Sequence, residues 1–476
     1  MTRRATLRGA ARTPLGGAAD VIVCGASFAG LAVARELAGS GADVLVLDRY
    51  EIGERQTSAC AAPTPWLRAM GVERAIRQEL PCMAFHTPHG SARFRLPWSW
   101  SSFDYRTLCE ALWAQCGDAR FEIAMVEGVE RSPRGSHTVR TDRGELTSPL
   151  VVDALGWRRV LGAGPVVQPP EAQISRGLEV HPDGGGTDLD VWIDRSLVRY
   201  GYAWSVPAAG EQRVGVGSYE PRHHVKAPTQ DIAARLGVPA VRYQGNWFPH
   251  ALRPAVEEGV FFAGDSAGHC FPLSGEGIRT AFYFGIACGR ELRRVLAGAT
   301  TREEALAAYG AFSAAHAPAF RTALRLQKLV PALPPRALTA LLSVVARRRP
   351  CRRAFTWYLE QAHPRFAAAP GGQPAGAPGV TCRTSTFIPS GSRANTAEQR
   401  GSSSYSLGPS MISAPCRTST AWARSTFPRA MSRALRRRWL TSAATPVIAR
   451  RSRGGQGTIT SLQFGASPCR RHASAT

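Results

Sequence analysis

The sequence predicts an α/β fold with a parallel sheet, an inserted, mainly antiparallel β-sheet and a set of C-terminal helices. Three stretches of the chain support this class. Residues 20–50 read as a strand, a helix and a second strand, and residues 259–292 read as a buried strand followed by a loop and a long helix. Between them, Tyr202 and Trp204 occupy alternate positions, as side chains on one face of a strand do.

The charge of the chain is concentrated at its two ends. The 476 residues, 44% of them hydrophobic, are enough for a buried core and for two to three domains, and the net charge is +24. Residues 1–19 hold four arginines and no acidic residue, and residues 364–476 hold sixteen arginines against one acid, Glu398. We therefore expect a disordered basic leader at 1–19, a mildly basic folded part, and a separate tail at 364–476.

The tail is rich in Arg, Ser and Pro and shows neither helical nor strand periodicity. One interpretation is an out-of-frame reading of a GC-rich gene, and the other is a disordered basic tail. The chain has 57 arginines against two lysines, which is typical of a high-GC bacterial coding sequence. Nucleic acid is not an expected partner, because the tail's aromatic residues are not interleaved with its arginines.

Targeting and metal-binding patterns are not found in the sequence. The basic leader lacks an apolar segment, and no run of 18 apolar residues follows it. The eleven cysteines show no ligand spacing, which argues against a metal site and against a disulfide framework. We expect a cytoplasmic protein with reduced thiols.

The first motif is DVIVCGASFAGLAVARELAGSGADVLVLDRY, residues 20–50. Its order and length fit the Rossmann-like βαβ unit that binds a dinucleotide. Gly25 makes the tight turn, Gly30 lets the helix approach the strand, and the amides at the helix N-terminus face a pyrophosphate. Asp48 ends the second strand, where it can accept hydrogen bonds from an adenosine ribose and disfavours a 2′-phosphate.

Ser27 is the one departure from the fingerprint G-x-G-x-x-G, since it stands at the middle glycine. Glycine there lets the backbone approach the phosphates. Serine adds one small side chain and supplies a hydroxyl that can donate to a phosphate oxygen. The turn alone therefore does not separate a dinucleotide site from an ordinary strand-turn-helix.

The second motif is GVFFAGDSAGHCFPLSGEGIRTAFYFGIACGREL, residues 259–292. Its strand ends in Gly264-Asp265, and a loop containing Pro272 leads to Gly275-Glu276-Gly277 at the start of a helix. An aspartate at a strand end can hold a polyol hydroxyl, and a helix N-terminus stabilises an electron-rich ring. A flavin has both the polyol and the electron-rich ring, because its ribityl chain carries hydroxyls and its reduced ring carries negative charge.

The two motifs together resemble the FAD-binding fold of the para-hydroxybenzoate hydroxylase type. Three further segments resemble the geranylgeranyl reductase family: Gly201-Tyr202-x-Trp204-x-x-Pro207, the run PLSGEGI at 272–278, and the strand-end Asp153-Ala-Leu-Gly156. The matches span about residues 20–295. The resemblance implies a discontinuous FAD-binding domain at 20–300, a substrate-binding sheet inserted at about 80–105 and 165–250, and a helical cap at 301–363.

The resemblance implies bound FAD, with NAD(P)H as a transient reductant because no second dinucleotide turn follows. The residues that it assigns to FAD are Gly25, Ser27, Phe28, Ala29, Gly30, Asp48, Arg49, Arg106, Gly264, Asp265, Pro272, Gly275, Glu276, Gly277 and Ile278. Arg106 is out of register, since the family arginine precedes the Phe-Asp pair, where Trp100 stands here.

The implied activity is reduction of a C=C bond in a prenyl-lipid or other apolar small-molecule substrate. The resemblance places Tyr202, Trp204 and Pro207 at the substrate, with the two aromatic rings walling an apolar cavity over the flavin. Sheet-core aromatics are the alternative interpretation of the same pattern.

The proton donor for this reaction is not assigned. Cys60 falls near the family's Cys-Gly-Gly segment, but alanines replace both glycines, and a buried structural thiol is the alternative. His269 and Cys270 lie beside the second motif, and we expect them to pack under the cofactor.

Two other functions use the same motifs. A flavin monooxygenase would react reduced flavin with O₂ and hydroxylate a small aromatic or apolar substrate, although Leu155 stands where that family has an aspartate. An inactive FAD-binding product of a frameshifted gene is the other. A flavin halogenase is not expected, because the first lysine of the chain, Lys226, follows the Tyr-x-Trp segment.

Residues 334–355 form an amphipathic helical stretch in which leucines and valines precede a run of arginines. Such a stretch fits a peripheral contact with a membrane that holds prenyl lipids. A solvated basic helix end packed on the domain is the alternative.

Overall fold

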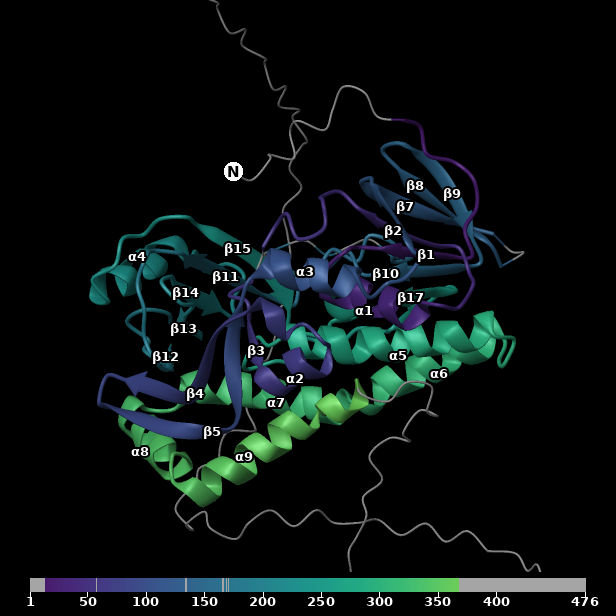
Figure 1. Cartoon of the computed structure of the whole chain (residues 1–476). Coiled ribbons are helices and arrows are strands. Elements are labelled where there is room, and N and C mark those ends of the chain that lie inside the picture. The colour runs from purple at the N-terminus through teal and green to yellow at the C-terminus, as the bar shows by residue number, and fades with distance from the viewer. Residues whose placement is uncertain are drawn as a thin grey trace, which may run out of the picture. The chain divides into compact units, whose positions relative to one another are not determined.

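The computed structural model describes residues 13–367, except 57, 133–134, 165–166, 168 and 170 (Figure 1). Of the predicted leader, residues 1–12 lie outside the described part of the chain and residues 13–19 are described. The predictions about the tail concern residues that, from 368 onward, lie outside the described part of the chain.

A six-stranded sheet forms the centre of the first motif's domain. Its order is β16 (Val256–Glu257), β17 (Val260–Phe262), β10 (Leu150–Asp153), β1 (Val21–Cys24), β2 (Val44–Asp48) and β6 (Arg120–Ile123). All neighbours run parallel except β16 and β17. The apolar runs of β1, β10 and β17 are buried along their whole length, as expected for a sheet covered on both faces. The predicted α/β class with a Rossmann-like parallel sheet is confirmed.

The chain builds this sheet outward in both directions from β1, so the strand order changes direction there. From β1 the chain continues to β2 and β6 on one side, whereas β10 and β17 lie on the other side. In open parallel sheets, ligands bind outside the carboxyl ends of the strands at such a point. The turn after β1 and the segment after β10 both lie there.

An eight-stranded sheet forms the inserted part, with the order β15 (Gln244–Pro249), β11 (Ile174–Val180), β14 (Gln212–Ser218), β13 (Gly201–Pro207), β12 (Leu189–Trp192), β4 (Ile76–Thr87), β5 (Gly90–Phe103) and β3 (Ala61–Pro63). Only β12 and β4 pair in parallel, so the sheet is mainly antiparallel, as predicted. Helix α4 (Lys226–Arg235) covers one face, where Val180, Ala203, Val214 and Val216 share a core with Ile232.

Helices α1 (Phe28–Leu37) and α5 (Ile278–Leu296) pack against each other beside the parallel sheet (Figure 1). Their backbones approach closely because α5 carries glycines at the contact. A Cβ on Gly285 would lie 2.7 Å from the Ala29 carbonyl oxygen, and one on Gly289 would lie 2.9 Å from that of Val33. Helix α3 (Tyr105–Trp113) also contacts α1, and Val126, Val139 and Leu146 bring the small sheet of β7 (Val126–Arg131), β8 (His137–Thr141) and β9 (Gly144–Ser148) into the same core.

The C-terminal part is helical. It consists of α6 (Arg302–Ala315), α7 (Ala317–Leu329), α8 (Pro335–Val345), α9 (Arg348–Glu360) and the short helix η5 (Pro364–Phe366). Its last residues are held by α2 (Thr64–Ala69) and α5. The Trp66 indole donates to the Ala362 carbonyl at 2.9 Å, and Arg290 donates to that of Phe366 at 2.8 Å. Residues 364–367, which the sequence analysis assigned to the tail, therefore belong to this helical part.

Candidate functional site

The turn after β1 requires glycine at two of the predicted positions. Gly25 has φ +114°, and a Cβ there would lie 2.3 Å from the Ala154 carbonyl oxygen at the end of β10. A Cβ on Gly30 would lie 1.8 Å from the carbonyl oxygen of Gly25. The Asp48 carboxylate accepts a hydrogen bond from the Ala26 amide at 2.9 Å and so joins the turn to the end of β2.

Ser27 does not need to be glycine in this fold. It precedes α1 in an extended conformation with φ −121°, which any residue adopts. Its hydroxyl lies 3.0 Å from the hydroxyl of Tyr105, the first residue of α3. Phe28 packs edge-on against Phe103, Tyr105 and Phe282, so its ring fixes the start of α1. The departure from the fingerprint is accommodated by the backbone and links the turn to α3.

A polar cavity of about 620 Å³ lies beside Tyr105, whose hydroxyl contacts Ser27. Its lining residues are Gly53, Glu54, Arg55, Gln56, Asp104, Tyr105, Arg106, Tyr243, Gln244 and Gly245. The structure thus brings Arg106 to the same cavity as Tyr105, the residue that contacts Ser27. It does not bring Arg49 there, because Arg49 is exposed and its guanidinium stacks on the Tyr50 ring at 4.9 Å.

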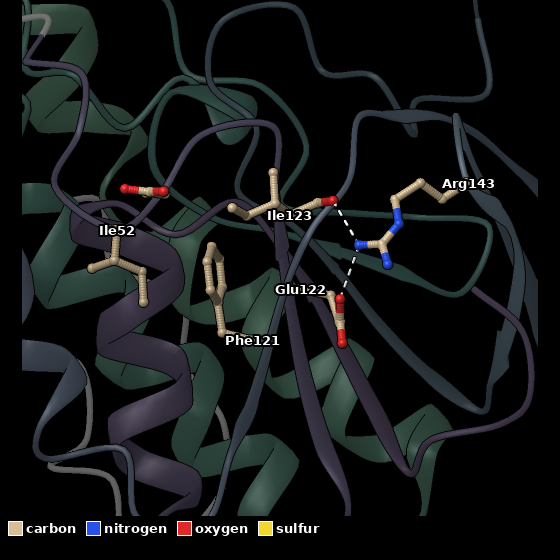
Figure 2. Close-up of a pocket in the computed structure, with 6 residues that line it drawn as sticks. Ile52, Phe121, Glu122, Ile123 and Arg143 are labelled. Carbon is tan, nitrogen blue, oxygen red and sulfur yellow. Dashed lines mark hydrogen bonds and ion pairs between the residues drawn. The ribbon is translucent and has the colours of Figure 1, made fainter. Parts of the chain in front are cut away.

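A second cavity, of about 470 Å³, opens beyond the carboxyl ends of β2 and β6. Figure 2 shows Ile52, Phe121 and Ile123 around it, with the Arg143 guanidinium turned toward Glu122. Arg143 donates to the Glu122 carboxylate and to the Ile123 carbonyl, both at 2.9 Å. Glu51 and Ile52, which line this cavity, follow Asp48 at the end of β2 along the chain.

The second motif reaches the same edge of the sheet. Gly264 follows β17 with φ +66°, and a Cβ there would lie 2.9 Å from the Cβ of Ala29 in α1. Burial raises the pKa of Asp265 to about 6, against the lowering effect of Arg253. Among the described residues, none donates a hydrogen bond to its carboxylate. Its Oδ1 lies 3.6 Å from the point that a Cβ on Gly277 would occupy, so the carboxylate faces the start of α5 without a partner.

The loop between η3 (Gly264–Ala267) and α5 is held in a strained shape. Leu273 has φ +72°, which is uncommon for a residue other than glycine. The Tyr202 hydroxyl donates to the Ser274 carbonyl at 2.5 Å, and the Tyr219 hydroxyl donates to the Leu273 carbonyl at 2.6 Å. The side chain of Gln327 in α7 accepts from the Leu273 amide at 2.8 Å. Two sheet strands and one helix thus fix the loop that contains Pro272.

Glu276 has a structural partner. Its carboxylate accepts two hydrogen bonds from the fully buried Arg279 guanidinium, both at 2.9 Å, and one from the Tyr358 hydroxyl. Arg279 also donates to the Leu359 carbonyl at 2.9 Å and the Ala362 carbonyl at 3.2 Å. The predicted cofactor residue Glu276 is therefore used, at least through its side chain, to join α5 to α9. Ile278, the first residue of α5, is buried in the core.

Tyr202 and Trp204 share one face of β13, and that face lies toward the loop. A Cβ on Gly275 would lie 2.9 Å from the Tyr202 hydroxyl. The Trp204 ring crosses β14, where a Cβ on Gly215 would lie 2.4 Å from it and one on Gly217 would lie 3.3 Å from it. Both aromatic side chains are only partly buried.

Pro207 is not brought to the same place. It ends β13 and is three residues beyond Trp204, so the alternation of side chains puts it on the opposite face. A Cβ on Gly186 would lie 2.8 Å from the Pro207 ring.

The reactive side chains near the motifs are buried. Burial raises the pKa of the Cys60 and Cys270 thiols well above the usual value, so both are neutral thiols. Cys60 also has φ +50° and is fully buried. His269 stacks on Phe284 with ring centroids 3.7 Å apart, and burial holds its pKa well below the usual range. Its Nε2 lies 3.0 Å from the hydroxyl of Ser313 in α6, so His269 packs between helices.

Sequence reasoning missed the polar side chains on the sheet face of Trp204. Glu179 is 3% exposed, and its carboxylate accepts a hydrogen bond from the Trp204 indole at 3.1 Å. His181 follows two residues later with its Nε2 2.8 Å from the same carboxylate. A glutamate and a histidine at alternate positions beside Leu178 and Val180, in the segment LEVH at the end of β11, were the signal that could have found them.

Comparisons with known proteins give structural neighbours only. No family model matches the chain, and no curated protein is significantly similar to it in sequence. A geranylgeranyl bacteriochlorophyll reductase-like protein from Thermoplasma acidophilum superposes with a TM-score of 0.65 at 16% identity, over 74% of this chain and 98% of the other. A protein described as a probable FAD-dependent monooxygenase from Pseudomonas aeruginosa gives 0.55 at 18% identity, over 69% and 99%. A flavin-dependent brominase gives 0.57 at 15% identity, over 74% and 93%.

The chain shares the fold of these three proteins. Its own residues are compatible with FAD, the cofactor that the two motifs predict. Gly25 and Gly264 allow the strand ends to lie close to Ala154 and to Ala29 of α1, where a Cβ would clash, and no hydrogen bond within the described part of the chain reaches the Asp265 carboxylate. Within that part, no cluster of His, Cys, Asp and Glu suited to a metal ion occurs, and none of the helices is long and apolar enough to cross a bilayer.

Proposed function

We propose that the protein is an FAD-dependent oxidoreductase. The observation that carries this proposal is the convergence of both motifs on one edge of the parallel sheet, where Gly25 follows β1 and Asp265 follows β17 with a carboxylate that no described residue donates to. The amides at the start of α1 and Arg106 would hold the pyrophosphate, Asp48 the ribose, and Asp265 the ribityl hydroxyls. Bound FAD would supply hydride chemistry, and the chain would position it and exclude water.

We further propose that the substrate is an apolar compound with a C=C bond, of which a prenyl chain is the favoured example, and that NAD(P)H supplies the electrons. The side chains of Tyr202 and Phe248 lie beside Gly275 in the loop before α5, and the Trp204 ring lies next to Tyr202, so a flat apolar group would be held between these rings and the cofactor. The likeness to a geranylgeranyl reductase-like structure supports this choice.

A monooxygenase is the second candidate, and one observation favours it. The sheet face at Trp204 contains the buried Glu179 carboxylate, which suits a substrate that carries a hydrogen-bond donor better than a pure hydrocarbon. A brominase has the same fold, but Lys226 begins α4, which covers the opposite face of the sheet from Trp204, and this placement argues against that chemistry.

We also propose that α8 and α9 contact a membrane surface. Leu341 and Val344 on α8 are 46% and 47% exposed, and Trp357 on α9 is 41% exposed. Exposed arginines at 347–349, 352 and 353 lie between these apolar side chains along the chain. Apolar residues next to guanidinium groups match a bilayer with anionic headgroups, where the prenyl substrate would reside.

Anaerobic reduction of the purified chain tests the enzyme proposals. The protein should co-purify with oxidised FAD, and NAD(P)H under nitrogen should bleach its visible absorbance. Re-oxidation on adding geranylgeranyl diphosphate, with a saturated product, supports the reductase. Re-oxidation only on adding O₂, with a hydroxylated product, supports the monooxygenase. Protein without flavin that also fails to bind added FAD contradicts both and supports the inactive product.

A further inference from the structure

Three side chains lie in one row behind Trp204. The Glu179 carboxylate accepts from the Trp204 indole at 3.1 Å and lies 2.8 Å from Nε2 of His181. Nδ1 of His181 lies 3.5 Å from the carboxylate of Glu211, which in turn accepts from Arg213 at 2.9 Å. The row therefore runs from the sheet face of Trp204 to Glu211.

The strand register puts the first member of this row on the candidate substrate face. Gln244, Glu179, Gly215 and Trp204 lie directly opposite one another on four neighbouring strands, so their side chains share one face. The Gln244 amide donates to Glu179 and also lines the 620 Å³ cavity. Side-chain exposure rises along the row, from 4% for Glu179 and 9% for His181 to 21% for Glu211.

The surroundings of His181 favour its charged form. Burial lowers the pKa of His181, but its contacts with the Glu179 and Glu211 carboxylates raise it by more, and the net shift is upward. The other charged groups that face the row are Arg213, beside Glu211, and Arg242, which donates to the His181 carbonyl and pairs with Asp183. Both ring N–H groups of an imidazolium are then directed at carboxylates.

We propose that Glu179 and His181 store and deliver the proton that reduction of the substrate requires. The inference rests on the proposed reductase function. Saturation of a C=C bond adds one hydride, from the reduced cofactor, and one proton. The Nε2 proton of His181 first moves to the Glu179 carboxylate. Glu179 then gives this proton to the substrate carbon, and its O–H bond breaks as the C–H bond forms, which restores the carboxylate. The neutral imidazole regains a proton from water after the product leaves. Glu211 is a positioning residue that holds the ring through Nδ1.

The test measures the two half-reactions of the full chain separately under nitrogen. Glu179→Gln should bind FAD and be reduced by NAD(P)H within about twofold of the wild-type rate. Its re-oxidation by geranylgeranyl diphosphate should slow by roughly 10²–10⁴-fold, the usual contribution of a general acid. The control is Glu127→Gln, which changes an exposed glutamate on β7 and should leave both rates unchanged.

A second variant keeps the proposal testable if Glu179→Gln does not fold. His181→Gln should retain FAD, slow re-oxidation, and remove both the solvent deuterium effect and the fall of the re-oxidation rate at high pH. If His181→Gln keeps the wild-type rates and isotope effects, the proposed proton delivery by Glu179 and His181 is overturned, whether or not Glu179→Gln folds. The reductase proposal is then unaffected. If geranylgeranyl diphosphate does not re-oxidise the reduced wild-type protein, the reductase proposal fails, and the proposed proton delivery fails with it.

Discussion

The hydroxyl of Ser27 lies 3.0 Å from the hydroxyl of Tyr105. This contact joins the turn after β1 to the helix that carries Arg106. We expect Ser27→Ala and Tyr105→Phe each to weaken FAD binding by about 1 kcal/mol, the usual worth of one hydrogen bond. If the two hydroxyls act through each other, the double variant should bind FAD as well as either single variant. Fluorescence titration with FAD measures all four proteins, and additive losses would show that the contact does not couple them.

Asp265 should make the stability of the FAD-free protein depend on pH. Burial raises the pKa of its carboxyl from 3.8 to about 6, so the folded chain holds this proton more tightly than the unfolded chain does. The stabilisation is therefore complete below pH 4 and is lost as the pH rises to 6. Asp265→Asn should raise the melting temperature of the FAD-free protein at pH 7.5 relative to wild type. The same variant should bind FAD more weakly, and unchanged affinity would contradict the ribityl assignment.

Removing one partner of the buried Glu276–Arg279 ion pair should lower the free energy of unfolding strongly. Arg279→Met leaves a carboxylate that is 6% exposed without its guanidinium, and we expect a loss of about 3–5 kcal/mol in urea unfolding. Glu276→Gln in the same chain should recover much of that loss. The exposed pair of Arg68 and Glu79 is the control, since Arg68→Met should cost less than about 1 kcal/mol.

Two truncations separate the helical part from the residues that follow it. A chain that ends at residue 367 keeps the contacts of Trp66 and Arg290 with Ala362 and Phe366, so it should melt close to the full chain and bind FAD equally well. A chain that ends at residue 360 removes the Ala362 acceptor of the fully buried Trp66 indole, at about 1–3 kcal/mol, and also the contact of Arg290 with Phe366. Equal melting temperatures for the two truncations would contradict this account.

Membrane contact through α8 and α9 should depend on both apolar and charged side chains. Vesicles with 30% phosphatidylserine should sediment the protein in about 0.05 M salt and less of it in about 0.5 M salt, because salt screens the arginines. Leu341→Ser with Val344→Ser should reduce binding at both salt concentrations. The matched control is Val167→Ser, which removes an exposed apolar side chain far from these helices in the chain. Equal binding to neutral vesicles would contradict a contact with anionic lipid.

The sequence predicted those parts of the site that depend on local backbone geometry. Gly25 and Gly264 have positive φ, and a strand-turn-helix pattern reports such positions because few other residues adopt them. The direction of Tyr202 and Trp204 followed from the two-residue period of a strand. The same period argues against Pro207, whose odd spacing from Trp204 puts it on the other face.

Contacts between distant segments could not be predicted in this way. Glu276 was assigned to the cofactor, but its carboxylate pairs with Arg279 and Tyr358, and Tyr358 follows it by 82 residues. The row of Glu179, His181 and Glu211 depends on the register of β11 against β14, which the hydrophobic pattern does not specify where glycines alternate.

The hydrogen bonds from Arg279 to the Leu359 and Ala362 carbonyls set an order of assembly during synthesis. Gly25, Asp48 and Asp265 are all made before the carbonyls that hold Arg279 leave the ribosome. The contacts between the start of α5 and this segment can therefore form only when translation has passed residue 362, so the closing of the fold around α5 is a late event in the life of the nascent chain. A change of reading frame after residue 367 would come too late to disturb these contacts.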